Sequence, residues 1–359
     1  MSNIKVLNTK DYFDNASNNN KGNVMYTALY PPGFINNHFS ERQYAFHEEF
    51  TIPKQEWKEA FVAVIPRGRV WGENGAVITD SGQLLGDVSY EFGKHPIEHS
   101  FFKTSTFKKS QEISGKVAIL ASAGGGYFHW VFGVLPRIHL ILKSGIRLDE
   151  IDKFVVSNRN TKFMKETLSY FGITEDKIIH SCKDFYIEAD ELIIPSLAWY
   201  RNSIPKWALD FLYSYSYNKN YQENPKNIYI SREDAKRRKI VNEKEILTLL
   251  EKKGFKKVIL SSFSVNEQAR LFNNAEVIIA SHGAGLSNIA FCNDKVKLIE
   301  IFSESYINPC YYIICNHKKI DYNYLVGKKI ISKEKHPLYD DIFVDTKKLL
   351  MMLDNLSVR

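Results

Sequence analysis

The second half of the chain alternates between short apolar runs and longer amphipathic stretches. The apolar runs predict strands over residues 227–231, 258–260, 277–280 and 296–301. The amphipathic stretches predict helices over 243–252, over 265–272 and from about Leu286 onward. Strands that alternate with helices are typical of a parallel sheet covered by helices. The pattern therefore predicts an α/β unit in this half of the chain.

The first half changes its pattern at about Lys116. Before this point, residues 61–89 consist of short apolar runs separated by glycine-containing turns, which predicts an antiparallel hairpin or meander. The Asn- and Lys-rich residues 14–22 predict a flexible surface segment. After Lys116, strands are predicted at 117–121, 154–156 and 192–194, with helices after the glycines at 124–126 and over 162–171. The predicted fold class is therefore α/β with an N-terminal β segment.

The length of 359 residues exceeds one ordinary hydrophobic core, so two domains are expected. Residues 213–226 are polar and aromatic and end close to an Asn-Pro pair, which marks a linker or an exposed crossover. The expected domains are an N-terminal domain over 1–212, with its β segment at about 60–90 and its α/β part at about 116–212, and a C-terminal domain over 213–335. Residues 336–359 are expected to form a closing helix, for which packing back on the N-terminal domain is one arrangement.

The helix predicted at residue 243 carries its own start signal. Asn242 stands at the N-cap position and Glu245 follows three residues later, which is the spacing of a capping box. In such a box the two side chains satisfy backbone N–H groups that the first turn leaves unpaired. The sequence therefore predicts that this helix begins at Glu243.

Composition restricts the function only mildly. The 48 basic and 41 acidic residues give a net charge of +7, which suits a protein that handles anionic small molecules. No aromatic and basic residues interleave, so we do not expect a nucleic-acid partner. The four cysteines show neither a CxxC pair nor zinc-ligand spacing, which predicts buried, reduced thiols in a cytosolic protein. No apolar run has membrane-spanning length, so we expect a cytoplasmic protein whose membrane association is at most peripheral, at the inner face.

A strand–glycine–helix corner at residues 281–288 (SHGAGLSN) is the first candidate site. Unpaired backbone N–H groups at a helix start favour an anion, and Gly283 and Gly285 would let a phosphate approach without a Cβ in the way. A dinucleotide fingerprint would need a glycine where the chain has Asn288, so an NAD site is disfavoured. A purely structural corner remains the alternative at this point.

A basic loop follows the predicted strand at 227–231. It carries Arg232, Lys236, Arg237, Arg238 and Lys239. A charge run is usually a solvated loop, but ligands of open α/β sheets bind where parallel strands end at their carboxyl edge. Arg232 and Arg238 are therefore candidates to grip a diphosphate from one side while the 283–286 amides hold the other.

A third segment, residues 123–137 (AGGGYFHWVFGVLPR), carries His129 and Arg137 after a glycine turn. Tyr127 opens the helix that follows this turn. A histidine one turn into a helix at the carboxyl edge of a sheet is well placed for acid–base work. A lone histidine among aromatic residues is more often a core residue, so both interpretations stay open.

Together these segments resemble glycosyltransferase family 61, which includes bacterial capsular polysaccharide proteins, plant xylosyl- and arabinosyltransferases and animal N-acetylglucosaminyltransferases. The matching residues are 127–137, 229–243, 275–292 and 298–301, with 67–78 resembling the family's N-terminal β segment. The resemblance implies a GT-B fold, two Rossmann-like domains facing across a cleft. Secretory members carry a membrane anchor that this sequence lacks, so it is more similar to the cytoplasmic bacterial proteins.

The resemblance also assigns residues to roles. It implies transfer, with inversion, of a sugar from a nucleotide-diphosphate sugar, with a UDP-sugar as first expectation, to a hydroxyl of a glycan acceptor in capsular or surface polysaccharide biosynthesis. The acceptor side or cleft would carry Tyr127, His129 and Arg137. The donor side would carry Arg232, Arg238, Asn242, Glu243, His282, Gly283, Ala284, Gly285, Asn288 and Glu300.

Inverting transfer needs a base for the acceptor hydroxyl and positive charge for the departing diphosphate. His129 is our first choice of base, with Glu73 or Asp87 as rivals. Glu300 would accept hydrogen bonds from ribose, unless the local backbone satisfies this acid. No Asp-x-Asp follows a predicted strand, so we expect no metal and no cofactor beyond the sugar nucleotide. The alternative function is a non-catalytic sugar-nucleotide-binding scaffold of a polysaccharide assembly complex, and no pattern indicates an oligomeric state.

Overall fold

The computed structural model describes residues 6–18, 24–35, 54–104, 107, 109–157, 160–200, 203–215 and 225–358. The chain divides into two compact units, Met1–Phe34 with Glu56–Ala208 and Ile35–Gln55 with Leu209–Arg359. The division falls inside helix α5 (Lys206–Tyr215), where the sequence predicted a boundary after residue 212. Of the predicted linker, 213–215 belong to α5 and 216–224 lie outside the described residues.

The first unit is built on one ten-stranded mixed sheet, in the order β1-β8-β7-β6-β12-β9-β10-β11, with β5 between β12 and β2. Its strands are β1 (Val6–Leu7), β2 (Met25–Tyr30), β5 (Ala60–Pro66), β6 (Arg69–Trp71), β7 (Ala76–Ile78), β8 (Leu84–Leu85), β9 (Gln111–Ile119), β10 (Lys153–Ser157), β11 (Ile178–Ser181) and β12 (Tyr186–Pro195). A separate ribbon pairs β3 (Gly33–Ile35) with β4 (Gln55–Trp57). The predicted meander is confirmed at β6–β7–β8, and β12, β9 and β10 are parallel as expected, while the parallel strand β11 was not predicted. The β segment and the α/β part therefore share one sheet.

Helices cover both faces of this sheet. They are α1 (Thr9–Asn18), α2 (Tyr127–His129), α3 (Leu135–Lys143) and α4 (Lys162–Tyr170), with short 3-10 turns η1 (Pro96–Glu98), η2 (Ser100–Lys103), η4 (Leu148–Glu150) and η5 (Glu175–Lys177). Tyr12 and Phe13 of α1 join the core that Phe61, Val117 and Ile187 form on one face. The expectation of a flexible segment from residue 14 is therefore wrong for 14–18, which are helical, while 19–23 lie outside the described residues.

A π-helical segment, η3 (Trp130–Val134), separates α2 from α3. Pro136 lies just beyond it, at the start of α3. A proline inside a helix lacks the N–H that would bond four residues back, and its ring clashes with that carbonyl. A widened π turn relieves this clash, and such segments are frequent at functional sites. The helix predicted after the glycines therefore forms, with an irregular first half.

The second unit is a six-stranded sheet in the order β14-β13-β15-β16-β17-β18. Its strands are β13 (Asn227–Ile230), β14 (Lys256–Val258), β15 (Val277–Ser281), β16 (Lys297–Ser303), β17 (Asp321–Ile330) and β18 (Asp341–Phe343). The first five are parallel and only β18 is antiparallel. The four strands predicted for this half are thus present, in a 2-1-3-4-5 order of the doubly wound kind.

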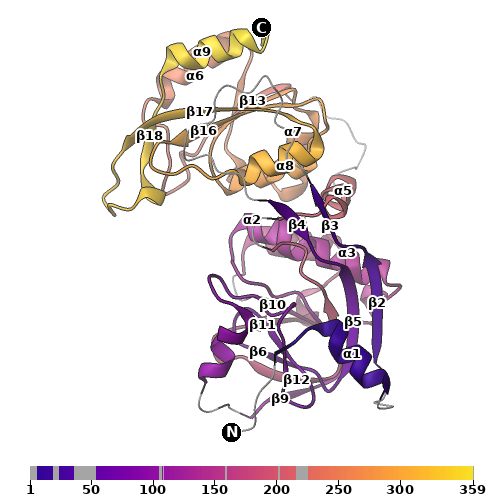
Figure 1. Cartoon of the computed structure of the whole chain (residues 1–359). Helices are drawn as coiled ribbons and strands as arrows, with labels where there is room; N and C mark the ends of the chain where they lie inside the picture. Colours follow the sequence, from indigo (N-terminus) through magenta and orange to yellow (C-terminus); the bar gives the residue numbers. More distant parts are fainter. Residues whose placement is uncertain are drawn as a thin grey trace. The chain divides into compact units, whose positions relative to one another are not determined.

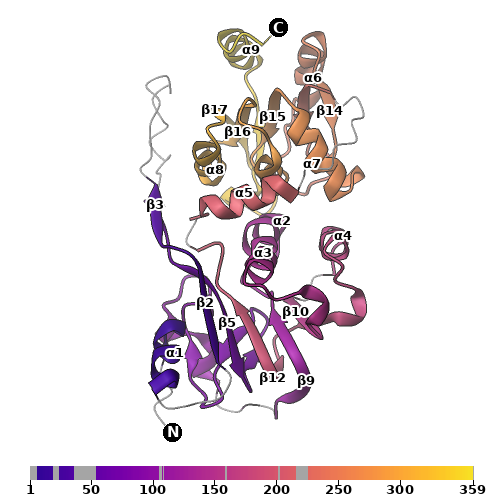
Figure 2. The ribbon, with the colours of Figure 1, turned by 90° about the vertical axis from the view of Figure 1, so that its right-hand side faces the viewer.

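The helices lie on the two faces as right-handed crossovers require. They are α6 (Glu243–Lys252), α7 (Val265–Asn274), α8 (Cys310–Lys318) and α9 (Thr346–Asn355), with 3-10 segments η6 (Leu260–Ser262), η7 (Ala284–Phe291) and η8 (Pro337–Tyr339). Figures 1 and 2 show α6 and α9 on one face of this sheet and α7 and α8 on the other. Leu349 and Leu353 of α9 pack with Ile246 and Leu250 of α6 in one core. The closing helix therefore packs in the core of the second unit.

Three local expectations need correction. The helix expected from about Leu286 is a 3-10 helix that begins at Ala284. The helix at 243 begins where predicted, but the side chain of Asn242 forms no cap hydrogen bond. Of the four cysteines, all free, Cys292 and Cys315 are buried whereas Cys182 is exposed. Within the described ranges, no helix is both long and apolar enough to span a membrane.

Candidate functional site

The strand order of the second unit indicates where a ligand would bind at the edge of its sheet. The helix after β13 lies on one face of the sheet and the segment after β15 lies on the other, so the chain diverges between two adjacent parallel strands. A crevice at the carboxyl ends of two such strands is where open α/β sheets bind ligands. The loop after β13 carries Arg232 and Arg238, and the loop after β15 carries His282 and Gly283.

Arg232 lies just beyond β13, and its guanidinium packs against Gly283. Its Nε and Nη2 donate to the carbonyl oxygen of Arg237, at 3.4 and 3.1 Å. A Cβ at position 283 would collide with Nη1, so this glycine makes room for the arginine. Burial and the neighbouring Arg238 lower the pKa of Arg232 to about 10. It remains charged at neutral pH, without a carboxylate at ion-pair distance among the residues described.

Arg238 is the second cation, and it is only 8% exposed. Its Nε donates to the carbonyl oxygen of His282 at 2.9 Å and its Nη1 to that of Leu338 at 3.0 Å. Burial, and then the charge of Arg237, lowers the pKa of Arg238. Its backbone has a φ of 55°, in the left-handed region that non-glycine residues rarely adopt. Strained backbone of this kind concentrates at ligand sites.

The two guanidiniums, one half-buried and one buried, have neutral carbonyl oxygens as their hydrogen-bond acceptors among the described residues. The charge of Arg238 also lowers the pKa of Arg232. Buried charges are normally paired, because an unpaired one loses its hydration without gaining a partner. An anion bound between them would supply the missing partner.

His282 is held in place by a buried carboxylate. Glu300 Oε1 lies 2.6 Å from Nδ1 of the ring, and Glu300 Oε2 accepts a hydrogen bond of 2.7 Å from Tyr322. The strand register explains this meeting, because Ala280 pairs with Glu300 and alternate residues share a face. Nδ1 then carries the proton, and Nε2 has no hydrogen-bond partner in the described part of the chain.

Glu300 therefore does not face a ligand directly. It is 0% exposed, and both of its oxygens are engaged by side chains. The expected hydrogen bonds to a ribose are not compatible with this position. The alternative interpretation, an acid satisfied by the local backbone, also differs from the structure, because the partners of Glu300 are the side chains of His282 and Tyr322.

The glycine-rich corner is shaped by protein side chains as much as by space for a ligand. Arg232 fills the room beside Gly283, and a Cβ on Gly285 would meet Cδ1 of Leu260. Ala284 is exposed and begins η7, so the first N–H groups of this segment have no partner within it. The corner thus offers backbone donors next to Arg232.

The remaining predicted donor-side residues have structural partners. Asn242 donates to the carbonyl of Val344 at 2.9 Å and accepts from its N–H at 3.1 Å. Glu243 accepts hydrogen bonds from Tyr229 and Ser231, at 2.9 and 2.7 Å. Asn288 is 0% exposed and donates to Gln268 Oε1 at 2.8 Å. These three side chains stabilise the scaffold that carries the arginines.

In the first unit, His129 lies among aromatic rings. Its centroid is 4.8 Å from that of Trp199, 5.5 Å from Phe92 and 5.4 Å from Phe128. Gly124, with a φ of 85°, permits this position because a Cβ there would meet the imidazole. Tyr127 packs edge-on against Phe163, at 5.2 Å.

Arg137 does not line an open site, because it is 0% exposed. Its Nη1 donates to the carbonyl of Ala121 at 2.8 Å, and its Nη2 to that of Pro195 at 3.0 Å. Pro195 is the last residue of β12, and Ala121 lies two residues beyond the end of β9. Burial lowers the pKa of Arg137 to about 9. The expected cleft role is therefore replaced by a structural one.

The two rival bases lie elsewhere in the first unit. Asp87 accepts hydrogen bonds from the N–H and the hydroxyl of Thr9, at 3.0 and 2.7 Å, and so fixes the start of α1. Burial raises the pKa of Asp87, although the bonds from Thr9 oppose the shift. Glu73 is exposed at the tip of the β6–β7 hairpin.

The surroundings of His282 contain residues that sequence reasoning missed. Phe302 stacks on its ring at 5.3 Å, and Tyr306 and Tyr311 lie 5.5 and 5.4 Å away. Tyr322 completes the set through Glu300. Strand alternation could have paired Glu300 with His282, whereas nothing in the sequence indicates the aromatic residues that surround them.

Comparison with known proteins connects the two histidine-bearing segments. Residues 127–299 match the model of the family described as Glycosyltransferase 61. This part of the chain is similar to the glycosyltransferase 61 domain. It contains every residue predicted for the acceptor and donor sides except Glu300, which lies one position beyond it. The rival bases Glu73 and Asp87 also lie outside it. The resemblance noted in the sequence is confirmed over this range.

Two plant proteins match parts of the chain. The beta-1,2-xylosyltransferase RCN11 of Oryza sativa subsp. japonica is 31% identical over 93 residues, covering 24% of this chain and 17% of that protein. The beta-1,2-xylosyltransferase of Arabidopsis thaliana is 32% identical over 65 residues, covering 18% and 12%. The matches span less than a fifth of the length of these relatives. Together with the glycosyltransferase 61 domain, they support a glycosyltransferase.

Proposed function

We propose that the protein transfers a sugar, with inversion, from a nucleotide-diphosphate sugar to a hydroxyl of a glycan acceptor. The observation that carries the proposal is the pair of half-buried Arg232 and buried Arg238, cations whose hydrogen bonds go to carbonyl oxygens where the chain diverges between β13 and β15. A diphosphate is an anion with several acceptor oxygens, and planar guanidinium groups bind it with several charge-assisted hydrogen bonds.

In this proposal the second unit stabilises the leaving group. As the bond to the anomeric carbon breaks, negative charge grows on the diphosphate, and fixed cations lower the barrier because they need no reorganisation. The N–H groups at Ala284 and Gly285 add donors from the start of η7. A proton taken up at Nε2 turns His282 into a further donor, with Glu300 stabilising the imidazolium.

We propose His129 as the base that takes the proton of the acceptor hydroxyl. This assignment includes a GT-B arrangement, in which the two units face across a cleft. The irregular helix that carries His129, with its π-helical turn, supports a functional rather than a purely structural helix. We further propose that transfer needs no metal ion, because arginines and amides would supply the positive charge.

The proposal also covers the identity of the sugar donor and the cellular setting of the reaction. The two plant relatives are beta-1,2-xylosyltransferases, which favours a xylosyl donor as the first to test, within the wider expectation of a UDP-sugar. We propose a role in capsular or surface polysaccharide synthesis, in the cytoplasm or at the inner face of the membrane.

A binding screen followed by a turnover assay tests the proposal. Thermal shift against UDP-, GDP-, CMP- and dTDP-sugars should give one stabilising nucleotide class, and the bound sugar nucleotide should be hydrolysed or transferred. Turnover should persist in a chelator, and its loss with recovery on Mn²⁺ would refute metal independence. Binding without any turnover would favour the sugar-nucleotide-binding scaffold. Absence of binding by every sugar nucleotide would contradict the proposal.

A further inference from the structure

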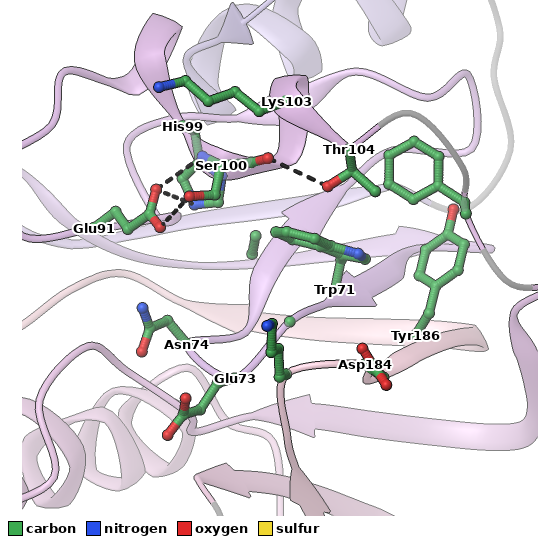
Figure 3. A pocket seen from close by; sticks show the side chains of 14 residues that line it. Trp71, Glu73, Asn74, Glu91, His99, Ser100, Lys103, Thr104, Asp184 and Tyr186 are labelled. Carbon is green, nitrogen blue, oxygen red and sulfur yellow. Dashed lines mark hydrogen bonds and ion pairs between the residues drawn. The ribbon is translucent and has the colours of Figure 1, made fainter.

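We infer that a pocket in the β part of the first unit is a binding subsite for a neutral saccharide, separate from the arginine site. The pocket has a volume of about 470 Å³, within the range of small-molecule sites. It is lined by the β6–β7 hairpin, the turn η2 and the loop that leads into β12 (Figure 3). The inference rests on the proposed function, since it gives the glycan acceptor a second point of attachment.

The walls of this pocket are fixed by backbone hydrogen bonds. At the hairpin tip, the N–H of Gly72 donates to the carbonyl of Phe185 at 2.8 Å, and the hydroxyl of Ser181 donates to the carbonyl of Glu73 at 2.6 Å. On the other wall, Glu91 accepts from the N–H and the hydroxyl of Ser100, at 2.8 and 2.7 Å. The pocket is therefore formed before any ligand arrives, which reduces the entropy lost on binding.

One wall is a row of aromatic rings. The centroid of Phe107 lies 6.3 Å from that of Trp71 and 5.8 Å from that of Tyr186. The rings contact one another along the wall and do not surround a void, as the rings of a cage for a quaternary ammonium group would. An aromatic face carries partial negative charge, which attracts the weakly positive C–H bonds on the flat face of a pyranose. The wall thus fits a sugar ring better than a cation.

The polar groups of the pocket fit hydroxyls. In Figure 3, Asn74 and Glu73 lie on one side of the indole of Trp71, and Ser100 and Thr104 lie on the other. The indole N–H of Trp71 and the side-chain amide of Asn74 have no hydrogen-bond partner in the part of the chain that the structure describes. Free donors and acceptors beside an aromatic face are what a ring bearing both hydroxyls and C–H groups requires.

The charge of the pocket argues against a second phosphate site. Its lining contains no arginine, and its cations are the exposed Lys103 and Lys183, against the acids Glu73, Glu91 and Asp184. The arginine site has the opposite character, with buried guanidiniums and no carboxylate at ion-pair distance among the described residues. The arginine site therefore suits an anionic sugar nucleotide, whereas this pocket suits a neutral saccharide.

A buried, unpaired donor supports a ligand-binding role for this wall. His99 is 3% exposed, and its Nδ1 accepts a hydrogen bond from the N–H of Phe101 at 3.1 Å. Its Nε2 then carries the proton but lies 3.9 Å from Glu91 Oε2, beyond hydrogen-bond distance, and has no other partner among the described residues. Folded proteins rarely leave such donors unpaired, and each costs about 1–3 kcal/mol. The unpaired donor in this wall therefore indicates that the wall binds a ligand and does not serve packing alone.

The test measures glycan binding and nucleotide binding on the same preparations. The full chain is applied to an array of neutral oligosaccharides of xylose, glucose, galactose, mannose and N-acetylglucosamine, and the hits are titrated by calorimetry. The variants are Glu73→Gln with Asn74→Ala, which removes exposed polar groups at the hairpin tip, and Trp71→Phe, which keeps an apolar ring. Glu112→Gln, an exposed acid on β9, is the matched control.

We expect the pocket variants to bind the hit roughly tenfold more weakly, with sugar-nucleotide affinity and melting temperature unchanged. Glu112→Gln should bind like the original chain. The inference is overturned if no oligosaccharide binds, if the variants bind as tightly as the control, or if choline binds more tightly than every sugar. If nucleotide binding is intact beside any of these results, the proposed arginine site is not contradicted. If nucleotide binding is absent while glycan binding is retained, only the proposed sugar transfer is contradicted.

Discussion

Two corners with the same local design serve different ends in this chain. Each follows a parallel strand, each contains a glycine that makes room for one side chain, and each carries a histidine. At Gly124 the room is taken by the ring of His129, and at Gly283 it is taken by the guanidinium of Arg232. The first corner is lined by aromatic rings, whereas the second collects cations.

The difference arises from what happens to the arginines near each corner. Arg137 is fully buried, and its hydrogen bonds satisfy two carbonyls at strand ends. Arg232 and Arg238 also bond to carbonyls, but they lie together at an edge where donor groups of a helix start gather. The same residue type therefore stabilises the fold in one unit, and in the other it forms the anion site that we propose.

The largest effect is expected from His129→Ala, which tests whether His129 in the first corner acts in catalysis. If His129 is the base, turnover should fall roughly 10²–10⁴-fold, because general-base catalysis contributes that much, while donor affinity stays unchanged. Steady-state kinetics beside calorimetric titration of the sugar nucleotide measures both. His95→Ala, an exposed histidine of the same unit, is the control. Near-normal turnover in His129→Ala would reduce this corner to a packing feature.

Arg232→Ala and Arg238→Ala test the second corner. Each should weaken nucleotide binding by roughly 100-fold, because a charge-assisted hydrogen bond to phosphate contributes about 1.5–3 kcal/mol. Arg147→Ala removes an exposed arginine and should change nothing. Titration of the sugar nucleotide and of its free diphosphate checks the prediction, and unchanged affinity in both variants would rule out the arginine pair as the diphosphate site.

Arg137→Ala tests whether the arginine near the first corner stabilises the fold and takes no part in nucleotide binding. Loss of the hydrogen bonds to Ala121 and Pro195, together with the cavity, should lower the free energy of unfolding by about 3 kcal/mol. Nucleotide affinity of the remaining folded protein should not change. Urea unfolding followed by titration measures both quantities, and a selective loss of affinity without loss of stability would return Arg137 to a binding role.

The smallest effect is expected from Gly283→Ala, whose Cβ would displace the guanidinium of Arg232. Its backbone is extended, so strain is not involved and the damage should act through the arginine. Nucleotide affinity should fall roughly tenfold alone, and no further in Arg232→Ala, because two changes that act on one interaction are not additive. Additive losses in this double-mutant cycle would show that Gly283 acts independently.

The sequence predicted the elements of the second unit well because each depends on local pattern. The helix at Glu243 begins where the apolar spacing and Asn242 indicate. The reason given for it was nevertheless wrong, since Asn242 bonds to Val344, 102 residues later. The boundary could be predicted from nearby residues, whereas the partner of the side chain could not.

The strand–glycine–helix corner was predicted by the sequence alone, because strands, turns and helix starts follow from short-range periodicity and glycine placement. The similarity to glycosyltransferase family 61 was also found in the sequence, but through the resemblance of its ordered motifs to that family. Tertiary structure decided which polar groups remain for a ligand. Glu300 is taken by His282 and Tyr322, Arg137 by strand-end carbonyls, and Arg232 is left with carbonyl oxygens alone among its described partners. Whether a charge is satisfied depends on neighbours that are distant in the chain, so only the folded protein separates a structural residue from a binding one.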